Sequence, residues 1–256
     1  MASKVRNLTR IAMLHIGMQG FRTLSGNKVR TEMALQLLQA LKGRTDLVVF
    51  PAGYLLVKNE MDASDLLAPV FECAKDNELS VILGVDEPKS SVLVWGKPDQ
   101  IRRITVNHCM PCYLYAYSNQ TQSYFVWRQR TMNNQQAADQ WSSDWLASME
   151  RSFIVNDNRI EVWICGECYD PRVRNATYAR SPDVVLILSH YTMPRFARTL
   201  KALARSSHLP ILQTDHRSNP GGLFPAAANH KVLSHRNVGF RAKSRNVWVE
   251  GAFFNI

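Results

Sequence analysis

The sequence predicts a mixed α/β sandwich, in which helices pack on layers of buried strands. Short apolar, β-branched runs alternate with stretches that carry apolar residues at helical spacing, both early and late in the chain. Between these regions lies a series of short strand-like segments joined by turns. The 256 residues contain no linker, internal repeat or low-complexity segment, so we expect a single domain over residues 1–256.

The first part of the chain predicts three strands and two helices. A strand over Arg10–Ile16 precedes an amphipathic helix over Asn27–Leu41. The apolar run Asp46–Phe50 predicts a buried strand that stops at a proline. A second amphipathic helix over Ala63–Asn77 leads into a strand over Leu79–Val85. Strands and helices therefore alternate here, as the α/β class requires.

The middle of the chain predicts mostly strands. Four short strands joined by turns are expected at Ser91–Trp95, Ile104–Val106, Tyr113–Tyr117 and Ser123–Arg128. A weakly patterned helix over Ala137–Met149 follows. Phe153–Val155 and Arg159–Ile164 then predict a hairpin across Asn156–Asn158.

The last part of the chain returns to the alternating pattern. The run Asp183–Ser189 predicts a buried strand, Pro194–Ser206 a helix, and Leu209–Thr214 a further strand. Short strands at Lys231–Ser234 and Val247–Phe253 are expected to close the chain.

The segment most informative about function is Arg159–Val173, with the sequence RIEVWICGECYDPRV. Its apolar run ends abruptly at Cys165, and a glycine, polar residues and Pro171 follow. A rigid strand followed by a turn is where a nucleophilic thiol would be held and exposed. The alternative is that Cys165 is a buried packing residue, because free cysteine is among the most buried residue types.

The net charge limits the classes of partner. It is +10 at pH 7, which favours anionic ligands or simply a basic surface. Because the lysines and arginines are scattered and no nucleic-acid-binding motif is present, we expect no nucleic-acid partner. No apolar run approaches the ~18 residues needed to span a bilayer, and the N-terminus does not resemble a signal peptide, so we expect no membrane association.

The five cysteines indicate a reducing compartment. Their number is odd and they are spread over a long chain, so they do not form a disulfide framework, and we expect a cytoplasmic location. Two CxxC pairs, Cys109 with Cys112 and Cys165 with Cys168, offer four thiols for zinc. The stretch between the pairs is far longer than the usual ~15–20 residues of a zinc ribbon. We therefore expect packing residues and no metal. The alternative is a zinc-stabilised basic protein that contacts nucleic acid, which metal analysis would test.

The order of five segments resembles the carbon–nitrogen hydrolase (nitrilase) superfamily. These segments read DLVVFPAGYL, VILGVDE, YLYAYSNQTQSYFVWRQRTM, IEVWICGECYDPRV and DVVLILS, and together they span nearly the whole chain. The resemblance implies a four-layer αββα sandwich, usually paired into a homodimer. It also implies a Glu–Lys–Cys triad that acts on an amide or nitrile small-molecule substrate, with no cofactor.

The match to the triad is incomplete. Cys165 stands where the family places its nucleophile. Ala52 occupies the position of the family glutamate, the general base, and Gln129 occupies that of the lysine that supports the oxyanion. General-base help is typically worth ~10²–10⁴-fold and an oxyanion donor ~10²–10³-fold, so we expect a catalytically impaired protein.

Two alternatives to simple impairment stay open. Other groups could have taken over, and Glu167, two residues past Cys165, is the nearest substitute base in the sequence. Alternatively, the chain is a non-catalytic binding or scaffold protein on the same fold. Thiol reactivity discriminates between them, because an active-site cysteine alkylates faster than a peripheral one.

Several polar residues are expected to line a substrate pocket. They follow the strand ends or lie near the triad positions: Tyr54, Arg130, His190 and His216. The alternative for the histidines is a hydrogen-bonded structural role. The guanidinium groups near the site in sequence, those of Arg128, Arg130, Arg172 and Arg174, favour a ligand that carries an acid group.

Overall fold

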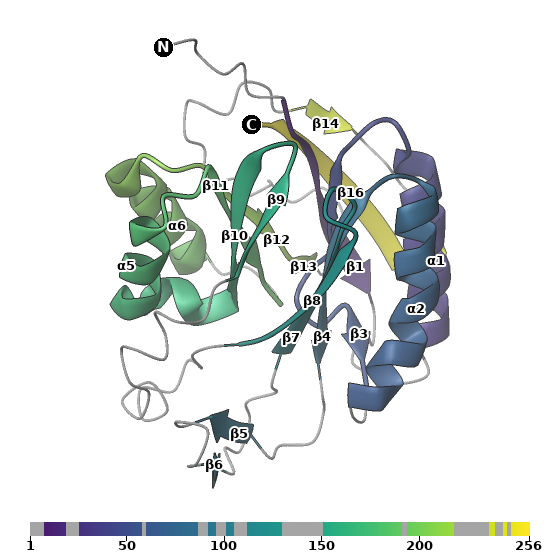
Figure 1. Cartoon of the computed structure of the whole chain (residues 1–256), viewed down its shortest axis with the longest axis horizontal. Helices are drawn as coiled ribbons and strands as arrows, with labels where there is room; N and C mark the ends of the chain where they lie inside the picture. The colour runs from purple at the N-terminus through teal and green to yellow at the C-terminus, as the bar shows by residue number, and fades with distance from the viewer. Residues whose placement is uncertain are drawn as a thin grey trace.

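The computed structural model describes residues 8–18, 26–57, 60–86, 92–95, 101–104, 112–129, 151–190, 194–217, 236–238, 243–244 and 247–256. Two sheets face each other, and helices cover the outer face of each sheet, with α5 and α6 on the left and α1 and α2 on the right of Figure 1. This four-layer αββα arrangement confirms the predicted fold class.

The larger sheet holds most of the strands. Its order is β14 (Arg236–Val238), β16 (Val247–Asn255), β1 (Arg10–Met18), β2 (Leu47–Val49), β4 (Ser80–Asp86), β7 (Cys112–Ser118) and β8 (Ser123–Arg128). Three short strands lie off this order: β3 (Leu55–Leu56) pairs with β4, β13 (His216–Arg217) with β1, and β15 (Lys243–Ser244) with β16. Strands β1, β2 and β4 are parallel, so their carboxyl ends lie at one edge.

The smaller sheet carries the segment with Cys165. Its order is β12 (Ile211–Thr214), β11 (Val184–Leu188), β10 (Asn158–Ile164) and β9 (Ser152–Val155). Strands β10, β11 and β12 are parallel, and β9 and β10 form the predicted hairpin. Its turn residues Asn156 and Asp157 have φ values of 48° and 65°, which Asn and Asp tolerate. A separate hairpin joins β5 (Val92–Trp95) and β6 (Ile101–Ile104).

Three apolar layers hold the sandwich together. Helices α1 (Asn27–Leu41) and α2 (Glu60–Asp76) pack on the larger sheet. A second layer fills the space between the sheets. Helices α5 (Pro171–Ala179) and α6 (Pro194–Ser207) pack on the smaller sheet. No helix in the described ranges is both long and apolar enough to cross a membrane.

The structure adds two elements after β10 that the sequence pattern did not predict. Residues Cys165–Tyr169 form a short 3₁₀ helix, η2, and α5 follows it where only a turn was expected. Asp170 caps α5 by accepting from the backbone N–H of Arg172, and Pro171 occupies the first turn, where its missing N–H costs nothing.

Most predicted boundaries agree with the structure, and a few differ or are untested. The segment expected at Ile104–Val106 is β6 at Ile101–Ile104, about three residues earlier. The helix expected over Ala137–Met149 and the strand expected over Lys231–Ser234 lie outside the described residues.

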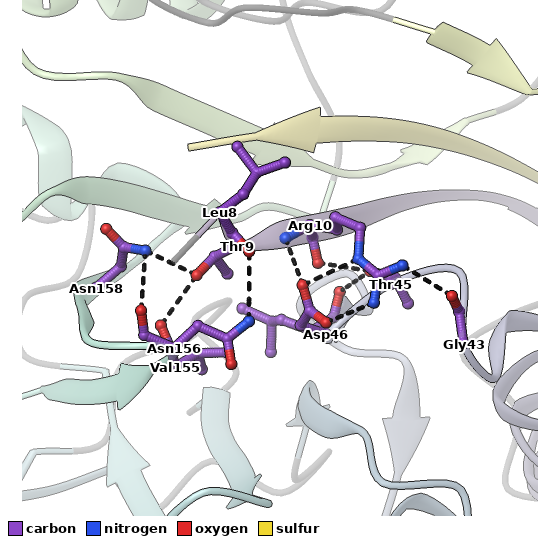
Figure 2. A network of polar contacts seen from close by, with 10 residues as sticks. Leu8, Thr9, Arg10, Gly43, Thr45, Asp46, Val155, Asn156 and Asn158 are labelled. Atoms are coloured by element: carbon purple, nitrogen blue, oxygen red, sulfur yellow. Dashed lines mark hydrogen bonds and ion pairs between the residues drawn. The ribbon is translucent and has the colours of Figure 1, made fainter. Parts of the chain in front are cut away.

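A polar network connects the two sheets at the amino ends of their parallel strands (Figure 2). The Thr9 hydroxyl, just before β1, donates to the carbonyl of Val155 at 3.0 Å. It also accepts from the side-chain amide of Asn158 at 2.8 Å. These contacts fix β1 against the β9–β10 hairpin. The parallel strands of both sheets therefore start at this end, and their carboxyl ends meet at the opposite end.

The same network links β1 to β2 through Arg10 and Asp46 (Figure 2). One Asp46 carboxylate oxygen accepts from the Arg10 backbone N–H at 2.7 Å, and the other accepts from Nη2 at 2.7 Å. The hydrogen bond and the charge of Asp46 raise the pKa of Arg10 despite partial burial. The Thr45 hydroxyl adds a bond to the Arg10 carbonyl at 2.7 Å.

We predict that Asp46→Ala lowers the free energy of unfolding by about 1–3 kcal/mol, because it leaves the Arg10 backbone N–H without its acceptor and removes a charged hydrogen bond. Urea unfolding measures this change. Asp65→Ala, at an exposed site on α2, is the matched control and should change stability by less than about 0.5 kcal/mol. Equal losses in the two variants would contradict the structural role of Asp46.

Candidate functional site

Cys165 lies at the carboxyl end of β10, where the strand turns into η2. Its backbone adopts a left-handed conformation with φ of 44°, which is uncommon for a residue with a Cβ. The side chain is half-buried and packs against the apolar layer between the sheets. The strand therefore ends just before the thiol, and the chain turns there into η2.

The turn after β2 lies closely against β4. A Cβ added to Gly84 of β4 would sit 2.4 Å from the Cα of Ala52, so only glycine lets the turn approach. The Gly84 N–H donates to the Pro51 carbonyl at 3.2 Å. Ala52 is fully buried in the same inter-sheet layer that Cys165 contacts. Ala52 and Cys165 therefore border the same apolar layer between the sheets.

An Asp–His pair lies beside this turn. Nε2 of His190, two residues past β11, contacts both carboxylate oxygens of Asp86, the last residue of β4, at 2.9 and 2.8 Å. A Cβ at Gly53 would sit 2.5 Å from an Asp86 carboxylate oxygen and 2.9 Å from Cδ2 of His190. Gly53 also has a φ of 62°. A glycine is therefore required where the turn meets the pair.

His190 also contacts Cys165. Burial disfavours its charge, but the charge of Asp86, the hydrogen bond to Asp86 and a side-chain hydrogen bond with Cys165 together raise the pKa of His190 to about 10. The ring is therefore an imidazolium at neutral pH. Because Nε2 faces Asp86, Nδ1 is the ring nitrogen left to face the Cys165 sulfur.

His216, on β13, holds the Pro51–Gly53 turn in place through a hydrogen bond. Its Nε2–H donates to the Ala52 carbonyl at 2.8 Å. Burial, together with the charge of His190, lowers the pKa of His216 to about 4, so this ring is neutral at physiological pH. The preceding residue, Asp215, pairs with Nδ1 of the buried His15 at 2.5 Å. His216 is thus held firmly, with one ring nitrogen committed to the backbone of the turn.

A buried cation lies near Asp86. Arg30 of α1 is 1% exposed, and its Nε and Nη1 find no hydrogen-bond partner within the described part of the chain. Burial lowers the pKa of Arg30 to about 10, while Tyr54 and Asp86 act in the opposite direction, so it keeps its charge at neutral pH. The fully buried Tyr54 donates its hydroxyl to the Arg30 carbonyl at 2.6 Å, which anchors α1 to the turn.

Glu167 is buried beneath the Cys165 turn. One carboxylate oxygen accepts from Nη1 of Arg151 at 2.8 Å and from the Ile164 N–H at 3.0 Å, and both charged side chains are 0% exposed. Glu167 lies in the 3₁₀ helix η2, which turns the chain after Cys165. Glu167 therefore reaches back to the end of β10.

Two of the arginines near Cys165 in sequence stabilise local structure. Arg172 pairs with Asp170 at 2.9 Å, and Nη1 of Arg174 donates to the Cys168 carbonyl at 2.7 Å. Cys168 itself is fully buried, and burial raises the pKa of its thiol. These contacts hold the segment between η2 and α5 in place.

Gln129 follows β8 at the same edge of the larger sheet. Arg128 of β8 pairs with Tyr113 of β7, which pairs with Val85 of β4. Gln129 therefore lies two strands away from Asp86, at the level of the site.

Other predicted site residues cannot be placed. Arg130 and Cys109 lie outside the described residues. Among the residues that the structure describes, no three His, Cys, Asp or Glu side chains are grouped to hold a metal ion.

The sequence prediction missed Asp86 and Arg30. Asp86 ends the apolar run VILGV, and a polar residue at a strand end was the signal that identified His190. Arg30 gave no signal, because an arginine in an amphipathic helix is usually exposed.

Comparison with solved structures finds similar folds at low sequence identity. A mutant amidase from Nesterenkonia sp. AN1 in complex with acrylamide aligns over 100% of this chain and 93% of its own, with 10% identity and a TM-score of 0.59. The same amidase, a member of the nitrilase superfamily, with the acetamide moiety of fluoroacetamide covalently added at its active-site cysteine, aligns over 97% and 90%, with 12% identity and a TM-score of 0.58.

A larger enzyme contains a similar unit. Glutamine-dependent NAD⁺ synthetase from Acinetobacter baumannii, in complex with ADP, aligns over 82% of this chain and 38% of its own, with 14% identity and a TM-score of 0.55. No protein-family model and no curated protein sequence matches this chain. The shared feature is therefore the fold.

We predict that Gly53→Ala displaces the Asp86–His190 pair and destabilises the fold by about 1–3 kcal/mol, because the new methyl group clashes with both side chains and the backbone is left-handed. Gly43→Ala is the matched control. Its φ is 70°, but nothing lies within 4 Å of an added Cβ, so it should lose only the conformational part, about 1 kcal/mol. Thermal unfolding measures both. Equal losses would show that the pair does not press on Gly53.

Proposed function

We propose that this chain, which has the fold of the nitrilase superfamily of carbon–nitrogen hydrolases, acts on a small molecule of the amide or nitrile class with Cys165 as nucleophile. The observation that carries the proposal is the placement of Cys165. Its thiol stands at a strained turn at the carboxyl end of a parallel strand, packed against the layer that contains Ala52. Ligands in open α/β sheets bind outside the carboxyl ends of the strands.

The chemistry of a similar protein supports a covalent role for this thiol. In the amidase from Nesterenkonia sp. AN1, the acetamide moiety of fluoroacetamide is added to the active-site cysteine. By its sequence resemblance, Cys165 stands where the family carries its nucleophile, and a cysteine thiolate is an intrinsically strong nucleophile. We therefore propose that Cys165 forms covalent adducts with small electrophilic amides.

The substitutions at two family positions limit the rate. Ala52 cannot accept a proton, and Gln129 carries no charge, so neither supplies what the family glutamate and lysine supply. Turnover of simple amides should be low for this fold. A non-catalytic binding protein is the second candidate, because Ala52 makes the wall of the site apolar. Hydrolysis that depends on Cys165 would separate the two.

We predict that Cys165 reacts with iodoacetamide at neutral pH faster than Cys73 and Cys168 do. Cys168 is fully buried and burial raises its thiol pKa, as it does for the half-buried Cys73. Peptide mapping by mass spectrometry identifies the labelled residue. Cys165→Ala should remove the fast phase, and Cys73→Ala, the control, should leave it unchanged.

Amide and nitrile hydrolysis by the same variants tests the enzymatic part. Any turnover should disappear in Cys165→Ala and persist in Cys73→Ala. Turnover that survives Cys165→Ala would refute the role of Cys165. Fast labelling without any turnover of an amide, nitrile or ester panel would favour the binding protein.

The structure supports an acidic group on the ligand through a residue other than those noted in the sequence. The guanidinium of Arg30 is buried and has no hydrogen-bonded counter-charge in the described part of the chain. It lies close enough to Asp86 for the two charges to interact. A buried cation without a partner costs several kcal/mol. A carboxylate from the ligand would offset that cost by pairing with the guanidinium. We therefore propose that the ligand carries an anionic group recognised by Arg30.

We predict that Cys165 prefers the anionic reagent iodoacetate over the neutral iodoacetamide, relative to free cysteine, and that Arg30→Met reduces this preference by about tenfold. Arg30→Met should not lower the melting temperature, because replacing an unpartnered buried charge by an apolar side chain is neutral or stabilising. Arg205→Met, at an exposed site on α6, is the control. An unchanged preference in Arg30→Met would exclude this role for Arg30.

The assembly and location stay predictions. The resemblance implies a homodimer, and the cysteine content implies a cytoplasmic location. We propose both on those grounds.

A further inference from the structure

We propose that His190 and Asp86 replace the missing glutamate and lysine of the family as the groups that activate Cys165. The site would then work as a Cys–His–Asp relay on a nitrilase-like fold. This inference rests on the proposed nucleophilic role of Cys165 and adds the two residues that serve it.

The three side chains come from three separate elements, and His190 contacts both Asp86 and Cys165. Asp86 ends β4 in the larger sheet, whereas His190 follows β11 and Cys165 follows β10 in the smaller sheet. The side chain of Asp86 is 2% exposed and that of His190 is 14% exposed, so the pair is shielded while its ring remains reachable. Both carboxylate oxygens lie within hydrogen-bond distance of Nε2. A carboxylate that fixes one ring nitrogen orients the other toward the nucleophile.

The charges around His190 favour an ion pair with the thiol. Asp86 faces it from β4 and Cys165 from η2, while the neutral His216 lies next to it on β13. Arg30 acts from α1 through its field on Asp86. With Asp86 on one side, His190 keeps its proton through neutral pH, and an adjacent imidazolium stabilises a thiolate. One cation thereby supplies the positive charge that Gln129 cannot.

The relay balances for an amide substrate. The Cys165 thiolate attacks the carbonyl carbon, a C–S bond forms, and the carbonyl π electrons move to oxygen. As the carbonyl reforms, His190 gives its Nδ1 proton to the leaving nitrogen, and the C–N bond breaks to release an amine. Water then attacks the thioester and gives a proton to the neutral His190. The C–S bond breaks, the carboxylic acid departs, and the thiolate and imidazolium are restored.

The replacement is consistent with alanine at position 52. At the next residue, Gly53, even an added Cβ would sit 2.5 Å from an Asp86 carboxylate oxygen and 2.9 Å from Cδ2 of His190. A glutamate at position 52 would add a second carboxylate beside Asp86, and two such groups at one site disfavour each other's ionisation. The loss of the family glutamate therefore fits the presence of Asp86.

The test compares full-length His190→Gln and Asp86→Asn with His208→Gln, an exposed control after α6. The alkylation rate of Cys165 by iodoacetamide is measured against pH. Near pH 6.5 the reaction should be at least tenfold slower in His190→Gln than in the wild type, because the imidazolium that stabilises the thiolate is absent. Asp86→Asn should also slow the reaction, and His208→Gln should leave its rate unchanged.

A second measurement uses the wild-type fold. Imidazole NMR should show His190 titrating well above the ordinary value of about 6.5, and alkylation of Cys165 should lower that midpoint. Because the folded pKa is raised, the contribution of His190 to stability is complete below about pH 6.5 and is lost as pH rises through about 10. His190→Gln should flatten this alkaline loss of stability.

The outcomes separate the two proposals. If His190→Gln reacts with iodoacetamide as fast as the wild type across the pH range, the relay is wrong, even where labelling and turnover still depend on Cys165. An unchanged His190 midpoint after alkylation would also overturn it. If turnover survives in Cys165→Ala, the proposed function fails instead.

Discussion

The arrangement of the site depends on the close approach of the Pro51–Gly53 turn to β4. The backbone of the turn rests on Gly84, where any side chain would collide with the Cα of Ala52. The Phe50 N–H donates to the Ile82 carbonyl at 2.8 Å, which extends the β2–β4 pairing into the turn. The last residue of the turn, Gly53, then lies close to the buried Asp86 and to His190. If the turn moved by about one ångström, groups that belong to different sheets would separate, because close-packed neighbours leave no room for a compensating shift.

The position of one sheet relative to the other depends on the segment that connects β12 to β13. The Thr214 hydroxyl of the smaller sheet donates to the Leu14 carbonyl of β1. Asp215 pairs with the buried His15 at 2.5 Å, and His216 then pairs with β1 in the larger sheet. This crossing joins the sheets at the carboxyl ends of their strands, whereas the Thr9 network joins them at the amino ends (Figure 2). With both ends fixed, the distance between Cys165 and the turn is set by the fold.

The sequence predicted the layers and many of the strand ends, because apolar periodicity and prolines mark both. It identified Cys165 and His190 for this reason. It did not identify Asp86 as the partner of His190, since that contact depends on how two sheets face each other, which periodicity within one strand does not encode. Arg30 was hidden because the helical pattern assigns an arginine to the solvent face. The helix after η2 was missed because Pro171 was taken as part of a turn, whereas it stands in the first turn of α5.

The left-handed backbone at Cys165 limits which residues other chains of this fold can carry at the same position without strain. A side chain at φ of 44° costs about 1–2 kcal/mol, a cost that glycine avoids and asparagine partly avoids. Drift toward greater stability alone would therefore favour replacing the thiol by glycine. A cysteine that is retained at this strained backbone position would therefore indicate selection for its sulfur. The ratio of glycine to cysteine at this position would thus distinguish lineages that use the thiol from lineages that keep only the scaffold.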